Sequence, residues 1–247
     1  MSWVVRIHGA DSESIEIAAT LAESSGWAHD GDTVLVGFID HGDAVRFAQE
    51  NRGVVEPART WDREDLAHIV LPTGEIELEV GAAFGHGGHP TSRLALDALD
   101  ALGPGEQRTL LDVGTGTGVL SIAAARQGFV ATGCDIDPEA VAVATRNAHR
   151  NSVEHNTSYV TASPSQLVST GWLAESEGFD IIVVNTLVGV HEIEGPAIVQ
   201  LGCPTATLVA TGLQGRDQVD RAVGSYPGYG IVDQRDEGPW SLVVLRQ

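Results

Sequence analysis

The run Leu111-Asp112-Val113-Gly114-Thr115-Gly116-Thr117-Gly118 is the part of this sequence whose residue types point most directly to chemistry. It follows a strand-like segment and opens a helical one, and glycines at such a turn let the backbone approach a ligand closely. Asp135 follows Gly114 by 21 residues, at the tip of the next predicted strand. A carboxylate there can accept hydrogen bonds from both hydroxyls of a ribose. The pattern therefore predicts a nucleoside-binding site.

Two kinds of nucleoside ligand, a dinucleotide and S-adenosylmethionine, are bound by loops of this type. The dinucleotide pattern has its third glycine three residues after the second, and this sequence has Val119 there. Asp112 precedes the loop, where an acid suits a cationic sulfonium with an amino-acid group better than it suits a pyrophosphate. A turn without a ligand is the alternative, but the correctly spaced acid argues against it. We predict that Asp112, Gly114, Gly116 and Asp135 bind S-adenosylmethionine.

A further candidate, Asn185, ends the fourth strand of the predicted sheet. In open α/β sheets the ligand lies beyond the carboxyl ends of the strands, so this side chain should project into the site. Its amide carbonyl can accept a hydrogen bond from an amine, and we predict Asn185 to be the catalytic residue, which orients the methyl acceptor. Alternatively, it only satisfies backbone groups of its own loop. His191, six residues later, is expected to be a structural residue near a helix start.

The elements that position these residues are short apolar strands that alternate with helices, in a pattern that begins after residue 81. The predicted strands are 109–113, 130–135, 157–161, 180–185, 205–211, 230–233 and 240–245, and the predicted helices are 91–102, 118–127, 138–150, 166–173, 189–201 and 216–224. Asp137 is expected to cap the helix that Pro138 begins. Such alternation implies a parallel sheet covered by helices on both faces.

The last two predicted strands differ from the others, because only the turn Glu237-Gly238-Pro239 separates them. A connection this short cannot make a parallel crossover, so the two strands must pair antiparallel. One reversed final strand is typical of methyltransferase sheets rather than of dehydrogenase sheets. The predicted fold class is α/β, a doubly wound Rossmann-like methyltransferase sheet of seven strands whose last strand is antiparallel.

The first 80 residues are organised differently. Residues 1–50 predict strand 3–7, helix 12–24, strand 33–38 and helix 43–49, a small α+β N-terminal domain that is a candidate for substrate recognition. Residues 51–80 are expected to be a linker followed by a hairpin, whose strands 68–71 and 75–80 flank a Pro-Thr-Gly turn. Residues 81–247 then form the S-adenosylmethionine-dependent methyltransferase domain.

The charge balance argues against one class of partner. The sequence has 34 acidic residues against 14 basic ones, all of them arginine, which gives a net charge of −20. A surface with this excess of negative charge repels the phosphate backbone of a nucleic acid. We therefore expect no direct nucleic-acid partner. The acidity could also steer a basic substrate, but solubility or the habit of the source proteome explains it more simply.

The composition also indicates the cellular compartment and whether a metal site is to be expected. No apolar run approaches the roughly 20 residues that a membrane helix needs, and the N-terminus lacks the features of a signal peptide. Cys134 and Cys203 are isolated, as in proteins of a reducing compartment. We expect a cytoplasmic protein with no membrane association. No metal site is expected, since His86 and His89 lack a third ligand at a predictable spacing.

Four motifs together resemble the PrmA family, whose members trimethylate amino groups of a large-subunit ribosomal protein at the stalk base. In order, they are Gly81-Ala82-Ala83-Phe84-Gly85-His86-Gly87-Gly88-His89-Pro90-Thr91-Ser92-Arg93, Asp112 to Gly118, Gly133-Cys134-Asp135-Ile136-Asp137-Pro138, and Asn185-Thr186-Leu187. The resemblance covers roughly residues 66 to 247. It implies an S-adenosylmethionine-dependent N-methyltransferase that modifies lysine or N-terminal amines of proteins, with the stalk-base protein as its partner.

By position, the resemblance implies that Ser92, Gly114, Asp135 and Asn185 contact the cofactor, and that Phe84 with its neighbouring glycines forms a flap over the methyl donor. The sequence departs from the family pattern at Gly85-His86-Gly87, at Ser92 in place of threonine, at Thr186 in place of an aliphatic residue, and in a shorter N-terminal region. Two alternatives stay open: a methyltransferase of a small molecule or another protein, and a non-catalytic cofactor-binding module.

Overall fold

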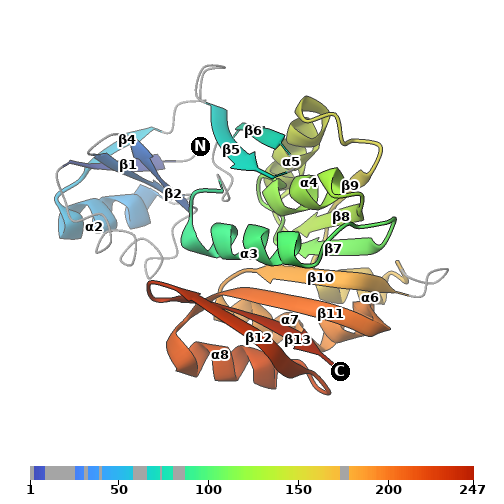
Figure 1. Ribbon diagram of the computed structural model, residues 1–247. Helices are drawn as coiled ribbons and strands as arrows, with labels where there is room; N and C mark the ends of the chain where they lie inside the picture. Colours follow the sequence, from blue (N-terminus) through green and yellow to red (C-terminus); the bar gives the residue numbers. More distant parts are fainter. Residues whose placement is uncertain are drawn as a thin grey trace.

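The computed structural model describes residues 3–8, 26–30, 33–38, 41–57, 66–72, 74–79, 87–172 and 178–247. Within these ranges the chain forms a four-stranded sheet, a two-stranded hairpin and a seven-stranded sheet, in that order along the sequence (Figure 1). The helix predicted over 12–24 lies outside the described residues.

The seven-stranded sheet has the order β12-β13-β11-β10-β7-β8-β9. Its strands are β7 (Thr109–Val113), β8 (Val130–Asp135), β9 (Thr157–Thr161), β10 (Phe179–Asn185), β11 (Gly202–Gln214), β12 (Gly230–Glu237) and β13 (Trp240–Arg246). The strands from β7 to β11 pair in parallel, whereas β13 runs antiparallel between β11 and β12. The predicted seven-stranded sheet with an antiparallel last strand is confirmed.

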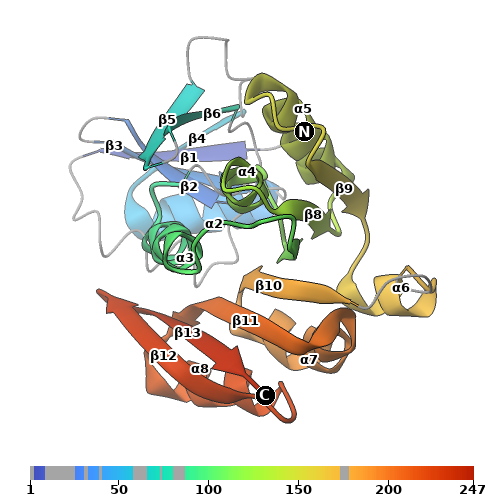
Figure 2. The same cartoon turned by 45° about the vertical axis from the view of Figure 1, so that its right-hand side comes forward.

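Helices cover both faces of this sheet (Figures 1 and 2). They are α3 (Pro90–Ala101), α4 (Val119–Arg126), α5 (Pro138–Arg150), α6 (Pro164–Ser169), α7 (Val188–Leu201) and α8 (Gly215–Gly224). Successive residues of a strand point to opposite faces, so Leu110 joins the core beneath α3, α4 and α5, and Leu111 joins the core beneath α6, α7 and α8. This is the doubly wound arrangement that the alternating pattern predicts.

The N-terminal sheet has the order β2-β3-β1-β4 and is antiparallel throughout. Its elements are β1 (Trp3–His8), β2 (Gly26–Asp30), β3 (Thr33–Phe38), α2 (His41–Asn51) and β4 (Val54–Pro57). Phe47 of α2 packs with Val5, Ile7 and Val36 of the sheet in a separate small core.

Two strands of this sheet correct the organisation expected from the sequence. β4 lies within the segment expected to be a linker, and β2 lies where no strand was predicted. Because β4 pairs with β1, residues 54–57 belong to the N-terminal sheet, which therefore extends beyond residue 50. Both β2 and β4 are edge strands. β4 has only four residues and ends at Pro57, so it is too short to show the apolar alternation by which a strand is recognised in a sequence.

The predicted hairpin is present as β5 (Leu66–Leu71) and β6 (Gly74–Glu79). Ile76 and Leu78 of β6 are fully buried and join the core beneath α3, α4 and α5. β6 contacts both α4 and α5. The hairpin therefore packs on the helical layer of the seven-stranded sheet.

A buried histidine fastens the carboxyl ends of two central strands. His191 of α7 is fully buried, and its Nε2 lies 3.2 Å from the carbonyl oxygen of Thr186 and 3.1 Å from that of Thr211. Both partners are acceptors, so Nε2 carries the hydrogen, and Nδ1 accepts from the Tyr226 hydroxyl at 2.5 Å. Burial lowers the pKa of His191 to about 4, so the ring is neutral. His191 thus holds the loop after β10 against β11.

His191→Gln tests this arrangement, because glutamine keeps an N–H donor but does not titrate. In wild type the folded state holds a neutral ring, whereas the unfolded chain protonates its imidazole near the ordinary pKa of 6.5. Wild type should therefore lose stability as the pH falls from 6.5 to about 4, by on the order of 3 kcal/mol from this residue. Urea unfolding over this range should show that loss reduced in the variant.

His155→Gln is the matched control, since His155 is an exposed histidine between α5 and β9. It should keep the acid slope of wild type. An unchanged slope in His191→Gln would contradict the assigned role of the buried ring.

Candidate active site

The loop between β7 and α4 has the backbone conformation that its glycines permit. Gly114, Gly116 and Gly118 have φ angles of 70°, 52° and 81°, in the left-handed region that favours glycine. The N–H groups of Gly114 and Thr115 donate to the carbonyl of Cys134 at 2.9 and 3.0 Å, which ties the loop to β8. A Cβ atom on Gly114 would lie 2.6 Å from the Thr186 methyl group, so the loop also packs closely against the end of β10.

Asp135 lies at the carboxyl end of β8, as predicted, and its carboxylate is held by backbone groups. Oδ2 accepts from the N–H of Gly116 and Oδ1 from the N–H of Asp137, both at 3.0 Å. The side chain remains partly exposed, so each oxygen keeps a lone pair for a further donor. Asp137 itself caps α5 by accepting from the N–H of Glu139 at 2.9 Å, which confirms its predicted role.

Ile136, between these two acids, was not identified from the sequence. It follows the end of β8 and is 76% exposed. An apolar side chain there offers a surface for a flat, apolar group beside the carboxylate of Asp135. An isoleucine between two acids at a strand tip is the signal that could have indicated it.

Asp112 is buried at the end of β7 and uses one of its two oxygens to hold the loop. Oδ2 accepts from the Thr115 hydroxyl at 2.7 Å and from the N–H of Ser121 at 3.2 Å. The hydroxyl groups of Ser121 and Tyr159 are 3.0 Å apart and extend this network to β9. Within the described parts of the chain, Oδ1 has no hydrogen-bond partner. Burial raises the pKa of Asp112 to about 6, against the effect of these hydrogen bonds.

Ser92 is fully buried in the first turn of α3, and its hydroxyl has no hydrogen-bond partner among the residues that the structure describes. Its position is fixed by contacts of His89 and Arg93, which lie on either side of it in the sequence. His89 caps α3 by accepting from the N–H of Thr91 at 3.2 Å, and its ring meets that of Trp240 edge-on at 4.8 Å. Arg93 donates to Glu237 and to a backbone carbonyl of the preceding loop. The β12–β13 hairpin thus fixes the start of α3.

Asn185 ends β10, and the sheet register places it next to the glycine loop. Val184 is paired with Val113, so Asn185 stands level with Gly114, while its other neighbour is Thr211 of β11. The Asn185 side chain is partly exposed. The next residue, Thr186, has a buried hydroxyl oxygen with no hydrogen-bond partner.

Among the described side chains, five buried oxygens have no hydrogen-bond partner, and three of them belong to segments of the predicted site: Ser92 Oγ, Asp112 Oδ1 and Thr186 Oγ1. β7 and β10 bring two of them to the carboxyl edge of the sheet. α3 starts at the same edge, because Trp240, which packs on His89, pairs with Gln214 at the end of β11. A buried polar atom without a partner costs about 1–3 kcal/mol. The arrangement therefore fits a polar ligand that carries hydrogen-bond donors and positive charge.

Some predictions cannot be placed on this geometry. Phe84 and His86 lie outside the described residues, so the flap expected there stays a prediction. Across the parts of the chain that are described, no group of three or more His, Cys, Asp or Glu side chains is arranged to hold a metal ion. None of the described helices combines the length and apolar character that crossing a membrane requires.

Comparison with known proteins gives consistent matches. The family model for ribosomal protein L11 methyltransferases (PrmA) matches residues 55–247. A ribosomal protein L11 methyltransferase of Thermus thermophilus is 33% identical over 193 residues, which cover 77% of this chain and 69% of that protein. One from Bradyrhizobium diazoefficiens is 31% identical, with 99% of this chain and 84% of that protein covered.

A solved structure agrees with these matches. The crystal structure of a ribosomal protein L11 methylase from Lactobacillus delbrueckii subsp. bulgaricus has a TM-score of 0.56 and 25% identity, and covers 67% of this chain and 81% of that chain. The family match begins at residue 55, upstream of the motifs that carry the sequence resemblance, and includes every residue of the site described above. The chain belongs to the ribosomal protein L11 methyltransferase (PrmA) family.

Proposed function

We propose that this protein is an S-adenosylmethionine-dependent N-methyltransferase that methylates amino groups of ribosomal protein L11, the stalk-base protein of the large subunit. The relatives that it matches are named for that substrate. The single observation that carries the proposal is the set of buried oxygens of Ser92, Asp112 and Thr186 that have no partner among the described residues, two of which, those of Asp112 and Thr186, belong to residues that contact the positive-φ loop.

The residues present fit the cofactor. Asp135 keeps lone pairs for the two ribose hydroxyls, and Ile136 offers an apolar surface for the base. Asp112 Oδ1 and Ser92 Oγ, both buried and without a partner among the described residues, suit the ammonium group of the amino-acid end. Gly114 lets the backbone approach the ligand without a side chain between them. When bound, S-adenosylmethionine supplies an electrophilic methyl group on a positively charged sulfur.

Asn185 is the residue that we assign to the acceptor amine. A lysine amine has an ordinary pKa of about 10.4, so it must lose a proton before its nitrogen can attack. The Asn185 carbonyl and a nearby backbone carbonyl accept hydrogen bonds from the amine and so direct its lone pair. Alignment of this kind can contribute up to about 7–11 kcal/mol. His191 is not a base here, because Nε2 donates to two carbonyls and Nδ1 is bonded to Tyr226.

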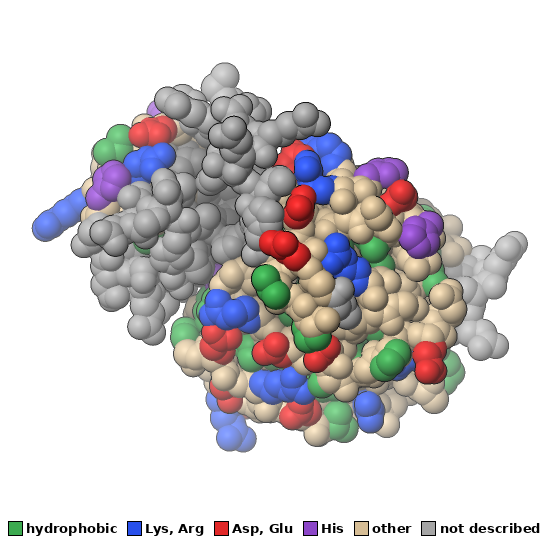
Figure 3. Space-filling view, turned by 45° about the horizontal axis from the view of Figure 1, so that its top comes forward, with side chains coloured by type: hydrophobic (Ala, Val, Ile, Leu, Met, Phe, Trp, Pro, Cys, Tyr) green, Lys and Arg blue, Asp and Glu red, His purple; other side chains and the backbone are tan. Residues whose placement is uncertain are grey.

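The surface charge fits a basic protein acceptor better than a nucleic acid. Figure 3 shows acidic and arginine side chains interspersed on one face of the molecule. Several described arginines are paired with acids, among them Arg146 with Glu79 and Arg221 with Glu192, and the sequence as a whole keeps a large excess of acidic groups. We place the protein in the cytoplasm, where ribosomal proteins are made, with residues 81–247 as the catalytic domain and the N-terminal sheet as the unit that recognises the protein substrate.

Incubation with labelled S-adenosylmethionine and three separate acceptors tests this function: purified L11, whole ribosomes and a metabolite extract. We expect label on L11. Label only in small molecules would overturn the proposal in favour of a small-molecule methyltransferase. Cofactor binding with no transfer to any acceptor would overturn it in favour of a binding module.

Asn185→Ala should lower kcat about a hundredfold, because the amine loses its alignment with the methyl donor. The affinity for S-adenosylhomocysteine should change little, since the loop and Asp135 remain. Single-turnover rates and calorimetry on the same preparation separate the two effects. Wild-type turnover in this variant would remove Asn185 from the mechanism.

Cofactor affinity should depend on the ionisation of Asp112. A cation bound at Oδ1 favours the carboxylate and so lowers its pKa, which is about 6 in the free protein. Affinity for S-adenosylhomocysteine should therefore rise with pH, by about tenfold from pH 5 to pH 7. Calorimetric titrations at several pH values measure this change.

Asp112→Asn should abolish the pH dependence, since the amide does not titrate. Asp137→Asn is the control, because asparagine caps a helix as well as aspartate does and the change removes a carboxylate from the same region. It should keep the wild-type dependence. A flat profile in wild type would show that Asp112 does not face the ligand.

A further inference from the structure

Two asparagines on α5 replace a neighbouring strand along the edge of β6. Asn147 and Asn151 lie one helical turn apart and are almost fully buried. Asn147 accepts from the N–H of Glu79 at 2.7 Å and donates to its carbonyl at 3.0 Å. Asn151 does the same with Glu77, at 3.1 and 2.7 Å. Each amide thus satisfies a backbone donor and a backbone acceptor that the hairpin leaves unpaired.

Asn147 makes one contact that Asn151 does not. Its Nδ2 also donates to the carbonyl of Thr117 at 2.9 Å, and this bond is buried. Thr117 lies between Gly116 and Gly118 in the cofactor loop, and the N–H of Gly116 holds Asp135. Both hydrogens of the Asn147 amide are used, one toward the loop and one toward β6. The orientation of the amide is fixed, since its oxygen would otherwise face two carbonyls.

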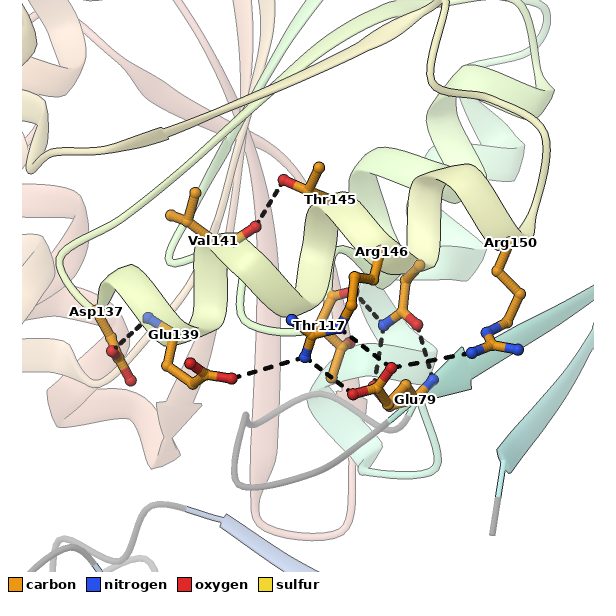
Figure 4. Close-up of polar contacts among 9 residues, drawn as sticks. Glu79, Thr117, Asp137, Glu139, Val141, Thr145, Arg146 and Arg150 are labelled. Atoms are coloured by element: carbon orange, nitrogen blue, oxygen red, sulfur yellow. Dashed lines mark hydrogen bonds and ion pairs between the residues drawn. The ribbon is translucent and has the colours of Figure 1, made fainter. Parts of the chain in front are cut away.

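Charged groups hold the same end of β6 against the helix (Figure 4). Arg146 donates to the Glu79 carboxylate through two nitrogens, at 2.9 and 3.3 Å, and Arg150 lies 3.9 Å from it. The Arg146 guanidinium keeps the pKa of the Glu79 carboxyl below its ordinary value. Glu79 is therefore fastened to α5 by its backbone and its side chain, and its carbonyl shares the Asn147 Nδ2 group with the carbonyl of Thr117.

We propose that Asn147 is a positioning residue of the cofactor site and that, through it, the β5–β6 hairpin is part of that site. The inference rests on the proposed function, because it takes the glycine loop to bind S-adenosylmethionine. Without the Nδ2 donor, the Thr117 carbonyl loses this buried hydrogen bond, and the loop is held less firmly in the conformation that places the Gly116 N–H against Asp135. The coupling is reciprocal, so cofactor binding stabilises the contact of β6 with α5.

Asn147→Ala and Asn151→Ala form a matched pair. Asn151 also donates to the carbonyl of Asn147 and accepts from Arg126, so its loss should destabilise the hairpin at least as much. We expect similar losses in urea stability for the two variants. Only Asn147→Ala should bind S-adenosylhomocysteine about ten- to hundredfold more weakly, as measured by calorimetry.

Hydrogen exchange of the wild-type protein gives a second test that needs no variant. Adding S-adenosylhomocysteine should slow exchange of the Glu79 amide, which donates to Asn147, more than that of the Glu77 amide, which donates to Asn151. Equal affinities in the two variants, or equal protection of the two amides, would overturn this inference alone. No binding by wild type would instead overturn the proposed function on which it rests.

Discussion

The buried carboxylate of Asp112 is the constraint on which the site depends. An ionisable group at the end of an apolar strand is costly to bury, and only the groups that bond to it offset that cost. Oδ2 takes donors from Thr115 and Ser121, one in the loop and one in α4, so the carboxylate fixes the turn between them. No described group donates a hydrogen bond to Oδ1, and this is the oxygen that we propose accepts a donor from the cofactor.

Features governed by local backbone geometry were predictable from the sequence. Alternate glycines after a strand permit the positive φ angles of a tight turn, and the structure has them at Gly114, Gly116 and Gly118. Asp137 followed by a proline predicts a helix cap, and the cap is present. The short turn after β12 requires an antiparallel partner, and β13 is one. Each of these depends on residues that are close together in the chain.

Features that depend on distant partners were not predictable. Apolar periodicity shows which face of a helix is buried, but not that Asn147 meets a strand 68 residues earlier or that His191 meets Tyr226. A polar residue on such a face is equally compatible with a solvent-exposed position until its partner is known. The edge strands β2 and β4 were not predicted for a related reason. Each pairs with another strand on one side alone, so its sequence is less constrained than that of an inner strand.

The two positioning side chains solve the same backbone problem. A loop that leaves a sheet has carbonyls without ladder partners, and buried carbonyls must be paired. Asn147 supplies the donor for Thr117, and His191 supplies it for Thr186 and Thr211. Both donors are uncharged, the amide by nature and the imidazole because burial lowers its pKa. A lysine or arginine in either place would add a positive charge close to the loop, whereas these neutral donors pair the carbonyls without a charge that would repel a cationic ligand.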